Sequence, residues 1–209
     1  MKKILFVLIG LFILTTAVAR KIPGTIIYKT GGAIDVVFNV PFKFLSSNPN
    51  YERMQYRIVY YDASNKKMVL KPGEAEEIRF AFGGQEIIML SRPNTLGAGS
   101  LFSNVNYIFL RLQIDGKMKL FNYYFSQSSP GMYSPATGGM GVGHTYTVEN
   151  YVLQKEDGAL VQPRGLTFRK DMTEYFRDCP ELVNRIQERE LRRGDLEIIV
   201  MEYNKKCGY

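Results

Sequence analysis

The sequence predicts an α+β fold: an antiparallel β-rich body, built as a meander or a sandwich, followed by a C-terminal three-helix tail. From Gly24 to about Pro163, apolar and polar residues alternate with period two between turn residues, which is typical of antiparallel strands. From Arg164 to Tyr209 the apolar spacing becomes helical. We expect residues 20–163 and 164–209 to pack together as one domain.

Met1 to Ala19 match the pattern of a cleavable secretory signal peptide. Two lysines precede an apolar run from Ile4 to Leu14, which is too short to span a membrane, and Ala17 and Ala19 form an A-x-A cleavage site. We therefore predict cleavage before Arg20 and export, to a periplasmic or outer-membrane-associated location. Because no later segment has the length of a membrane span, the mature chain should carry no transmembrane segment.

The composition argues against nucleic acid as a partner. Lys and Arg number 27 against 20 Asp and Glu, but the excess is dispersed: after Pro163, ten basic residues alternate with nine acidic ones. Binding to nucleic acid requires basic side chains concentrated on one surface. With 45% hydrophobic residues, the chain can bury a real core.

The strands of the body follow the alternation in order. The breakers Pro72-Gly73 and Gly83-Gly84 separate the later ones. Expected strands are Thr25 to Lys29, Ala33 to Phe42, Met54 to Tyr61, Met68 to Leu70, Glu77 to Phe82 and Glu86 to Leu90.

A hairpin from Tyr107 to Phe125 is the clearest unit. Asp115-Gly116 is favoured in two-residue type I′ turns, and such a turn would place Leu110 opposite Phe121. Apolar residues occupy both faces, so this hairpin should be central and buried. After it, the glycine-rich stretch Ser128 to Thr145 is expected to be a long mobile loop. A last hairpin should pair Tyr146 to Gln154 with Ala159 to Gln162.

The tail should hold three helices and one disulfide. Asp178 and Glu181 have the spacing of a capping box, with Pro180 in the first turn. Cys179 would begin the second tail helix and Cys207 would follow the third, so two antiparallel helices would bring the two cysteines together. In an oxidising compartment we expect them to pair.

No catalytic signature stands out. The only histidine, His144, lies in the glycine-rich stretch without a nucleophile elbow, and Gly139-x-Gly141-x-Gly143 lacks the spacing and the Lys-Ser or Lys-Thr of a phosphate loop. Acidic Glu74, Glu76 and Glu77 could supply a carboxylate pair for glycoside hydrolysis, although a solvated strand edge is the much simpler explanation for them. The sequence predicts no cofactor and no metal site.

Tyrosines suggest a contact surface. The chain has 14 Tyr and no Trp, and a tyrosine combines apolar area with a polar tip. Core packing is the simpler explanation for most of them. If a contact site exists, we expect it where the glycine-rich stretch leaves the central hairpin. Its candidate residues are Tyr123, Tyr124, Tyr133, Met140 and His144.

Three stretches resemble uncharacterised exported modules of Gram-negative envelopes, which occur alone or ahead of outer-membrane barrels. They are Leu70 to Ala75 leading into Ile78-Arg79-Phe80, the strand pair Phe109 to Tyr124, and Tyr175 to Leu182 followed by Tyr203-Asn204. The resemblance implies a compartment and a fold type, not an activity.

Three functional hypotheses follow from the sequence. The leading one is a non-enzymatic, exported binding or assembly module of the cell envelope with an envelope protein as its partner. The second is a hydrolase of envelope glycan or wall polymer that uses surface carboxylates. The third is a surface protein that binds a ligand such as a glycan.

Overall fold

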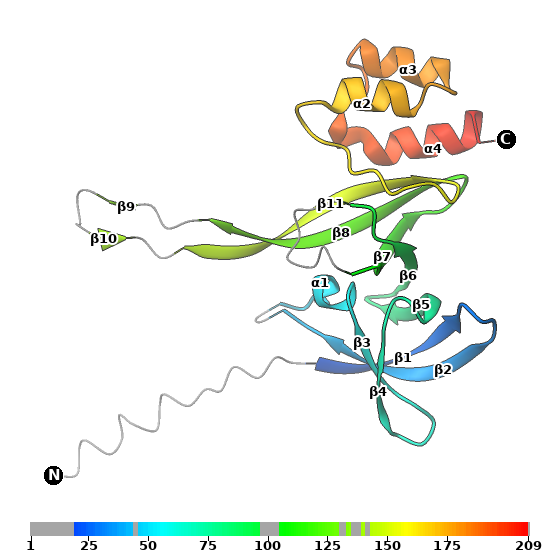
Figure 1. The fold of residues 1–209 in the computed structure, drawn as a ribbon, viewed down its shortest axis with the longest axis vertical. Coiled ribbons are helices and arrows are strands. Elements are labelled where there is room, and N and C mark those ends of the chain that lie inside the picture. The colour runs from blue at the N-terminus through cyan, green and yellow to red at the C-terminus, as the bar shows by residue number, and fades with distance from the viewer. Residues whose placement is uncertain are drawn as a thin grey trace.

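The computed structural model describes residues 19–43, 46–96, 105–129, 133–134, 139–140 and 143–208. In these ranges the chain forms a nine-stranded antiparallel sheet curled into a half-barrel, followed by C-terminal helices (Figure 1). The predicted α+β class is confirmed. Most of the predicted signal peptide, Ala17 included, lies outside the described residues, and Ala19 begins the first strand.

Two meanders joined edge to edge make up the sheet. The first comprises β1 (Ala19–Tyr28), β2 (Ala33–Pro41), β3 (Ile58–Tyr61) and β4 (Lys67–Leu70). The second comprises β5 (Ala75–Phe82), β6 (Gln85–Pro93), β7 (Tyr107–Ile114), β8 (Met118–Ser129) and β11 (His144–Lys155). The pairing of β1 with β5 gives the order β11-β8-β7-β6-β5-β1-β2-β3-β4. Between β8 and β11 in sequence, β9 (Tyr133–Ser134) and β10 (Gly139–Met140) form a separate two-stranded pair.

Gly24 allows the seam between the two meanders to close. A Cβ at this position would lie 2.2 Å from the Arg79 carbonyl oxygen on β5 and 2.6 Å from the Phe38 ring on β2. Both neighbours belong to paired strands, so neither can move away cheaply. Phe38 can thus lie across β1 and join Phe80 in the body core, with ring centroids 5.9 Å apart.

The predicted strand from Met54 to Tyr61 is wrong in its first half. A short helix, α1 (Tyr51–Met54), ends at Met54 and is followed by a turn, and β3 begins only at Ile58. The Asn50 side chain accepts a hydrogen bond from the backbone N–H of Arg53 at 3.2 Å, which satisfies a donor of the first helical turn.

The central hairpin is present, but its predicted register is wrong. Leu112, not Leu110, lies opposite Phe121, and the register shifts between Leu112 and Ile114. Asp115 to Lys117 form a three-residue connection in which the Asp115 carboxylate accepts from the Gly116 N–H at 2.9 Å. Because a shift of two residues keeps a side chain on its own face, Leu110 and Phe121 still share the predicted face. Ile114, beyond the register shift, instead pairs with Leu120 and packs on the other face. Leu110 and Phe121 share one buried cluster, while Phe109 belongs to another.

The tail consists of α2 (Phe168–Tyr175), α3 (Pro180–Gln187), a 3₁₀ turn (Arg193–Asp195) and α4 (Leu196–Lys206). These helices lie over one face of β8 and β11 (Figure 1). Met118, Leu120 and Leu153 of the sheet share their core with buried apolar residues of all three helices. The predicted disulfide is present: it joins Cys179, before α3, to Cys207, after α4, with the Cα atoms 5.7 Å apart.

The capping box predicted from the spacing of Asp178 and Glu181 is not formed at the start of α3. Cys179 is the N-cap residue of α3 and makes no side-chain cap bond. The Asp178 carboxylate instead accepts from Lys155 Nζ on β11 at 2.7 Å and from the Tyr203 hydroxyl on α4 at 2.6 Å. It therefore connects the tail to the body.

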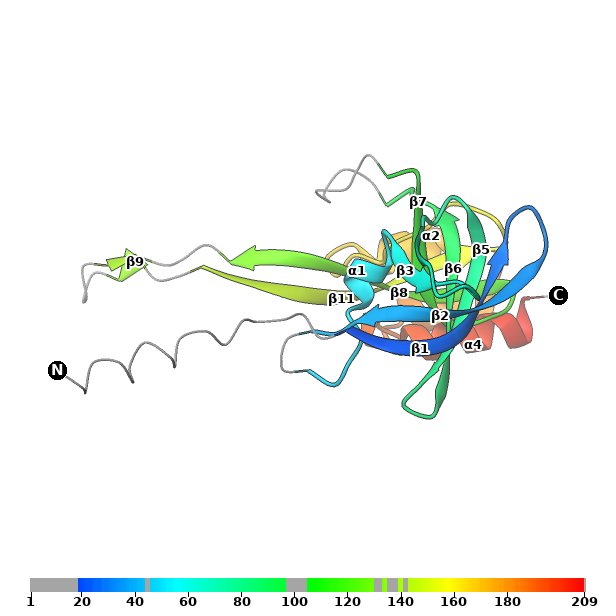
Figure 2. The same cartoon turned by 90° about the horizontal axis from the view of Figure 1, so that it is seen from below.

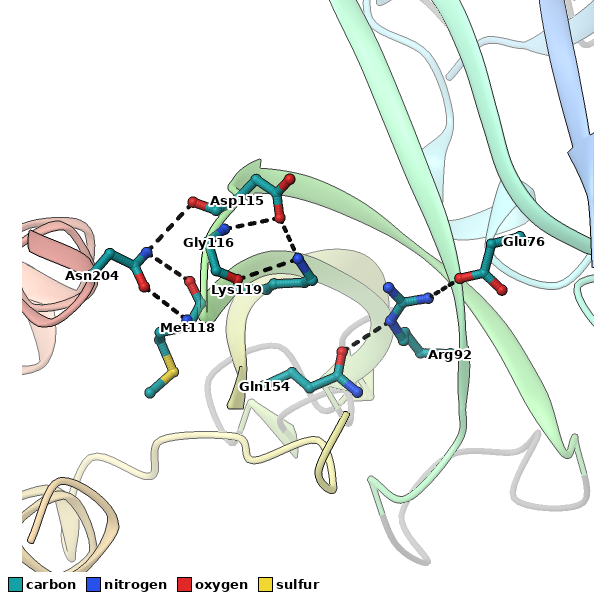
Figure 3. Close-up of polar contacts among 8 residues, drawn as sticks. All are labelled: Glu76, Arg92, Asp115, Gly116, Met118, Lys119, Gln154 and Asn204. Carbon is teal, nitrogen blue, oxygen red and sulfur yellow. Dashed lines mark hydrogen bonds and ion pairs between the residues drawn. The ribbon is translucent and has the colours of Figure 1, made fainter. Parts of the chain in front are cut away.

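Asn204 on α4 makes a second connection, at the turn between β7 and β8 (Figure 3). Its Oδ1 accepts from the Met118 N–H at 2.7 Å and its Nδ2 donates to the Met118 carbonyl at 2.8 Å. A Cβ on Gly116 would lie 2.5 Å from the Asn204 amide, so the turn requires glycine to admit this side chain. Arg92 lies nearby and joins β6 to β11 through Gln154 and to β5 through Glu76 (Figure 3).

Candidate functional site at the root of a ribbon

The prediction of a loop from Ser128 to Thr145 is wrong at both ends. The ladder between β8 and β11 continues without a break to the pair Ser129 and His144. The two strands leave the rest of the sheet and project from the body as a twisted ribbon (Figures 1 and 2). We call Phe125–Ser129 and His144–Val148 the outer ribbon.

The outer ribbon is solvated and uncharged. Ser126 to Ser129 and His144 to Tyr146 are exposed. From Phe125 to Val148 the sequence contains no Asp, Glu, Lys or Arg, although the 22% charged residues of the whole chain would give about five over this length. Edge strands of natural proteins are usually protected from pairing by charges or proline. In the described outer ribbon, such protection is absent from both strands.

The five predicted contact residues lie at different depths. Tyr123 and Tyr124 are buried, in clusters on opposite faces of β8. Tyr133 and Met140 are partners in the β9–β10 pair, for which the structure gives the backbone pairing. His144 is exposed at the start of β11, not within a loop as predicted. The residues therefore follow the length of the ribbon, with the two buried tyrosines at its root.

Gln55 fixes the point at which the ribbon leaves the sheet. Its side chain is fully buried and bonds both backbone groups of Tyr124: Nε2 donates to the carbonyl oxygen and Oε1 accepts from the N–H, each at 2.7 Å. The Gln55 backbone carbonyl accepts from the Phe109 N–H at 2.9 Å. Gln55 thus takes the place of a strand between β7 and β8, and it satisfies backbone groups that the separation of the strands would leave unpaired.

Glu52 of α1 holds both strands of the ribbon at its root. One carboxylate oxygen accepts from the Ser126 hydroxyl on β8 at 2.6 Å, and the other accepts from the Thr147 hydroxyl on β11 at 2.9 Å. In the same helix, the Tyr51 ring stacks on Tyr124 with centroids 5.3 Å apart. The direction of the ribbon is therefore set by α1 and Gln55, which sequence reasoning missed.

A surface hollow of about 350 Å³ opens beside this root. Its walls come from the segment after β2, the turn between β5 and β6, and the strands β7, β8 and β11. Five lining side chains are charged or carry an amide, while Tyr51, Phe82, Ile87 and Tyr124 contribute rings or aliphatic surface. The five are Lys43, Asn48, Gln85, Arg111 and Glu149.

A polar network crosses the floor of the hollow. The Tyr124 hydroxyl donates to Glu149 Oε1 at 3.1 Å and accepts a hydrogen bond from Arg111, whose guanidinium lies 4.9 Å from the centroid of the Tyr51 ring. Asn122 also donates to Glu149, while its own Oδ1 is buried and has no hydrogen-bond partner within the described residues. Unsatisfied buried polar atoms are rare in folded proteins, so this one requires an explanation.

Both tyrosine hydroxyls are protonated at neutral pH, as tyrosines ordinarily are, and their surroundings raise the pKa of each further. Burial raises the pKa of Tyr51 above its usual value, although Arg111 opposes the shift. Burial, followed by the nearby Glu149 carboxylate, raises the pKa of Tyr124. Both hydroxyls can therefore donate hydrogen bonds.

The three acidic residues proposed for hydrolysis are each engaged elsewhere. Glu74 accepts from the Lys71 N–H at 3.1 Å, Glu76 pairs with Arg92 at 2.7 Å and Glu77 pairs with Arg79. None of the three lines the hollow. Across the described ranges, no group of three or more His, Cys, Asp or Glu side chains is placed to hold a metal ion, and no helix is long and apolar enough to cross a membrane.

Comparisons with known proteins identify no relative. No family model matches the chain, and neither does any curated protein or solved structure. The resemblance to exported envelope modules therefore stays a prediction.

Proposed function

We propose that this chain is an exported, non-enzymatic binding or assembly module of the cell envelope, which contacts a protein partner through its outer ribbon. The observation that carries this proposal is the ribbon itself. Its two strands stay paired with each other beyond the last pair of β7 with β8, Arg111 and Asn122, and most of their side chains there are exposed.

The energetics of an isolated ribbon support a role in contact. A two-stranded ribbon in water is only marginally stable, because it orders the backbone without burying much apolar surface. Here the root is fixed by Glu52 and Gln55, so the ribbon is held in a defined direction before a partner binds. Such pre-organisation lowers the entropy cost of association.

The chemistry of the outer ribbon favours a partner that adds a strand or packs polar groups against it. Hydroxyl and amide side chains line it, and no charge repels an approaching backbone. Recognition by strand addition takes its affinity from main-chain hydrogen bonds and its specificity from alternate side chains. Tyr146, 50% exposed on β11, supplies the large aromatic surface expected of an anchor residue.

Export is supported by the N-terminal pattern of Met1 to Ala19 and by the disulfide between Cys179 and Cys207. Disulfides form and persist mainly in oxidising compartments. An envelope location places the partner in the same compartment.

Shortening the ribbon tests the proposal. Gln127 and Tyr146 are paired across the ladder, so an Asn-Gly turn can replace residues 128–145 and close a shorter hairpin. We expect the shortened protein to fold with nearly unchanged stability and to lose most of its partner in quantitative pull-downs from native membranes.

The β3–β4 hairpin provides a matched control. Tyr61 and Lys67 are paired there, so residues 62–66 can be replaced by the same Asn-Gly turn. This control should retain the partner. Unchanged capture by the ribbon-shortened protein, or equal loss by both variants, would exclude the distal part of the ribbon, residues 128–145, as the contact surface.

A further inference from the structure

Several charged and polar groups that line the hollow at the ribbon root are free to bind a ligand. Arg111 and Lys43 have no carboxylate within ion-pairing distance among the described residues. Among the described residues, Arg111 contacts the Tyr51 ring and the Tyr124 hydroxyl, which leaves most of its five N–H donors without a described acceptor. Two unpaired cations at one hollow attract an anion.

The remaining lining groups match neutral hydroxyls. Glu149 Oε1 is occupied by Tyr124 and Asn122, but in the described chain Oε2 accepts no hydrogen bond. The side-chain amides of Asn48 and Gln85 are exposed on the rim, and each offers both a donor and an acceptor. Such a mixture of donors and acceptors suits a polyhydroxylated molecule better than an apolar one.

The volume of the hollow and the net charge of its lining side chains limit the kinds of ligand that it can hold. A volume of about 350 Å³ lies at the lower end of the range of about 300–1,000 Å³ that is typical of small-molecule sites. Two cations against one carboxylate leave the lining with a net charge of +1. The hollow can therefore hold one or two sugar units that carry a single anionic group.

We propose that the hollow binds an anionic saccharide, with Arg111 and Lys43 holding its carboxylate or phosphate and with Glu149, Gln85 and Asn48 bonding its hydroxyls. The buried Asn122 amide lies behind this site and orients Glu149 through its Nδ2 donor. None of the lining residues falls within residues 128–145, so this site does not depend on the outer ribbon.

Titration of the purified chain with defined sugars tests the proposal. Galacturonic acid and galactose 6-phosphate are the acidic probes, methyl galactoside is the neutral control, and acetate and inorganic phosphate are the anions without a sugar. Binding is followed by calorimetry and by backbone NMR shifts. At least one acidic sugar should bind ten-fold or more tightly than both the neutral sugar and its own free anion, and which acidic sugar binds identifies the anionic group.

Three variants locate the site. Lys43→Met and the double change with Arg111→Met should weaken acidic-sugar binding, the double variant by at least ten-fold, while Arg79→Met on β5 should leave it unchanged. Within the described residues, Lys43 makes no cation–π contact with the Tyr51 or Tyr124 ring, so its replacement tests the charge without disturbing them.

Several outcomes would overturn the proposal. They are equal binding of the neutral sugar, equal binding of the free anion, no binding of either acidic sugar, or full binding by the double variant. Shortening the ribbon at residues 128–145 should leave sugar binding intact. The ligand site and the partner contact can therefore fail separately.

Discussion

Replacing Gln55 by alanine should destabilise the protein far more than an ordinary glutamine substitution. The change removes only the side-chain amide and keeps the backbone bond from Phe109 to the Gln55 carbonyl. It leaves the backbone N–H and C=O of Tyr124 without their hydrogen-bond partners. Because Tyr124 is buried, with 5% of its surface exposed, water cannot replace them. Each unsatisfied buried group costs about 1–3 kcal/mol, so the loss of partners for two groups should lower the free energy of unfolding by about 2–6 kcal/mol.

Urea denaturation measures this loss, and hydrogen exchange localises it. Amide protection should fall most in β8 around Tyr124 and in the outer ribbon, because Gln55 closes the point where the strands separate. Gln113→Ala is the matched control: this glutamine is exposed on β7, and its loss should change the stability by less than about 0.5 kcal/mol. A loss below about 1 kcal/mol for Gln55→Ala would refute the role assigned to its amide.

Three further changes test the stability of the tail and its attachment to the body. Reducing the disulfide, which closes a separation of 28 residues, should lower the stability by about 3–4 kcal/mol on the chain-entropy estimate, and an unchanged melting temperature under reductant would contradict this. Burial alone would raise the pKa of Asp178, but hydrogen bonds from Lys155 and Tyr203 hold it below its usual value. The stability from this lowered pKa is therefore present above about pH 4 and is lost as the pH falls through the folded-state pKa. Asp178→Asn should flatten the decline in unfolding free energy between pH 6 and pH 3, whereas Asp157→Asn at an exposed turn should not. Asn204→Ala should cost about 2–3 kcal/mol, because two hydrogen bonds to Met118 are lost, and a neutral result by calorimetry would show that the contact contributes nothing.

The fold class was predictable because the two periodicities occupy separate parts of the chain. Alternation marked strands such as β2, where Val36, Phe38 and Val40 are buried, and helical spacing marked α2 to α4. The hairpin register was not predictable from Asp115-Gly116 alone. Asn204, far away in sequence, packs against that turn, so its geometry depends on a tertiary contact.

The candidate site was located only in part by sequence. The contact hypothesis placed it next to Tyr123 and Tyr124, at what proved to be the ribbon root, but the glycines between Ser128 and Thr145 were interpreted as a loop. The absence of Asp, Glu, Lys and Arg from Phe125 to Val148 was the one feature of the sequence that could have marked this segment as unusual. Gln55 and Glu52 could not have been found, because a helix of four residues leaves no periodicity and the partners of their side chains lie at least 69 residues away.

Photo-crosslinking in intact cells tests the central claim most directly. A photoreactive amino acid is placed at Ser128 or Tyr146 on the outer ribbon, and at Val69 on β4 as an exposed control on the opposite edge of the sheet. We predict a discrete protein adduct from the ribbon positions and none from Val69. Adducts from Val69 alone, or none from either ribbon position in cells where the partner is captured by pull-down, would contradict the proposal that the ribbon makes the contact.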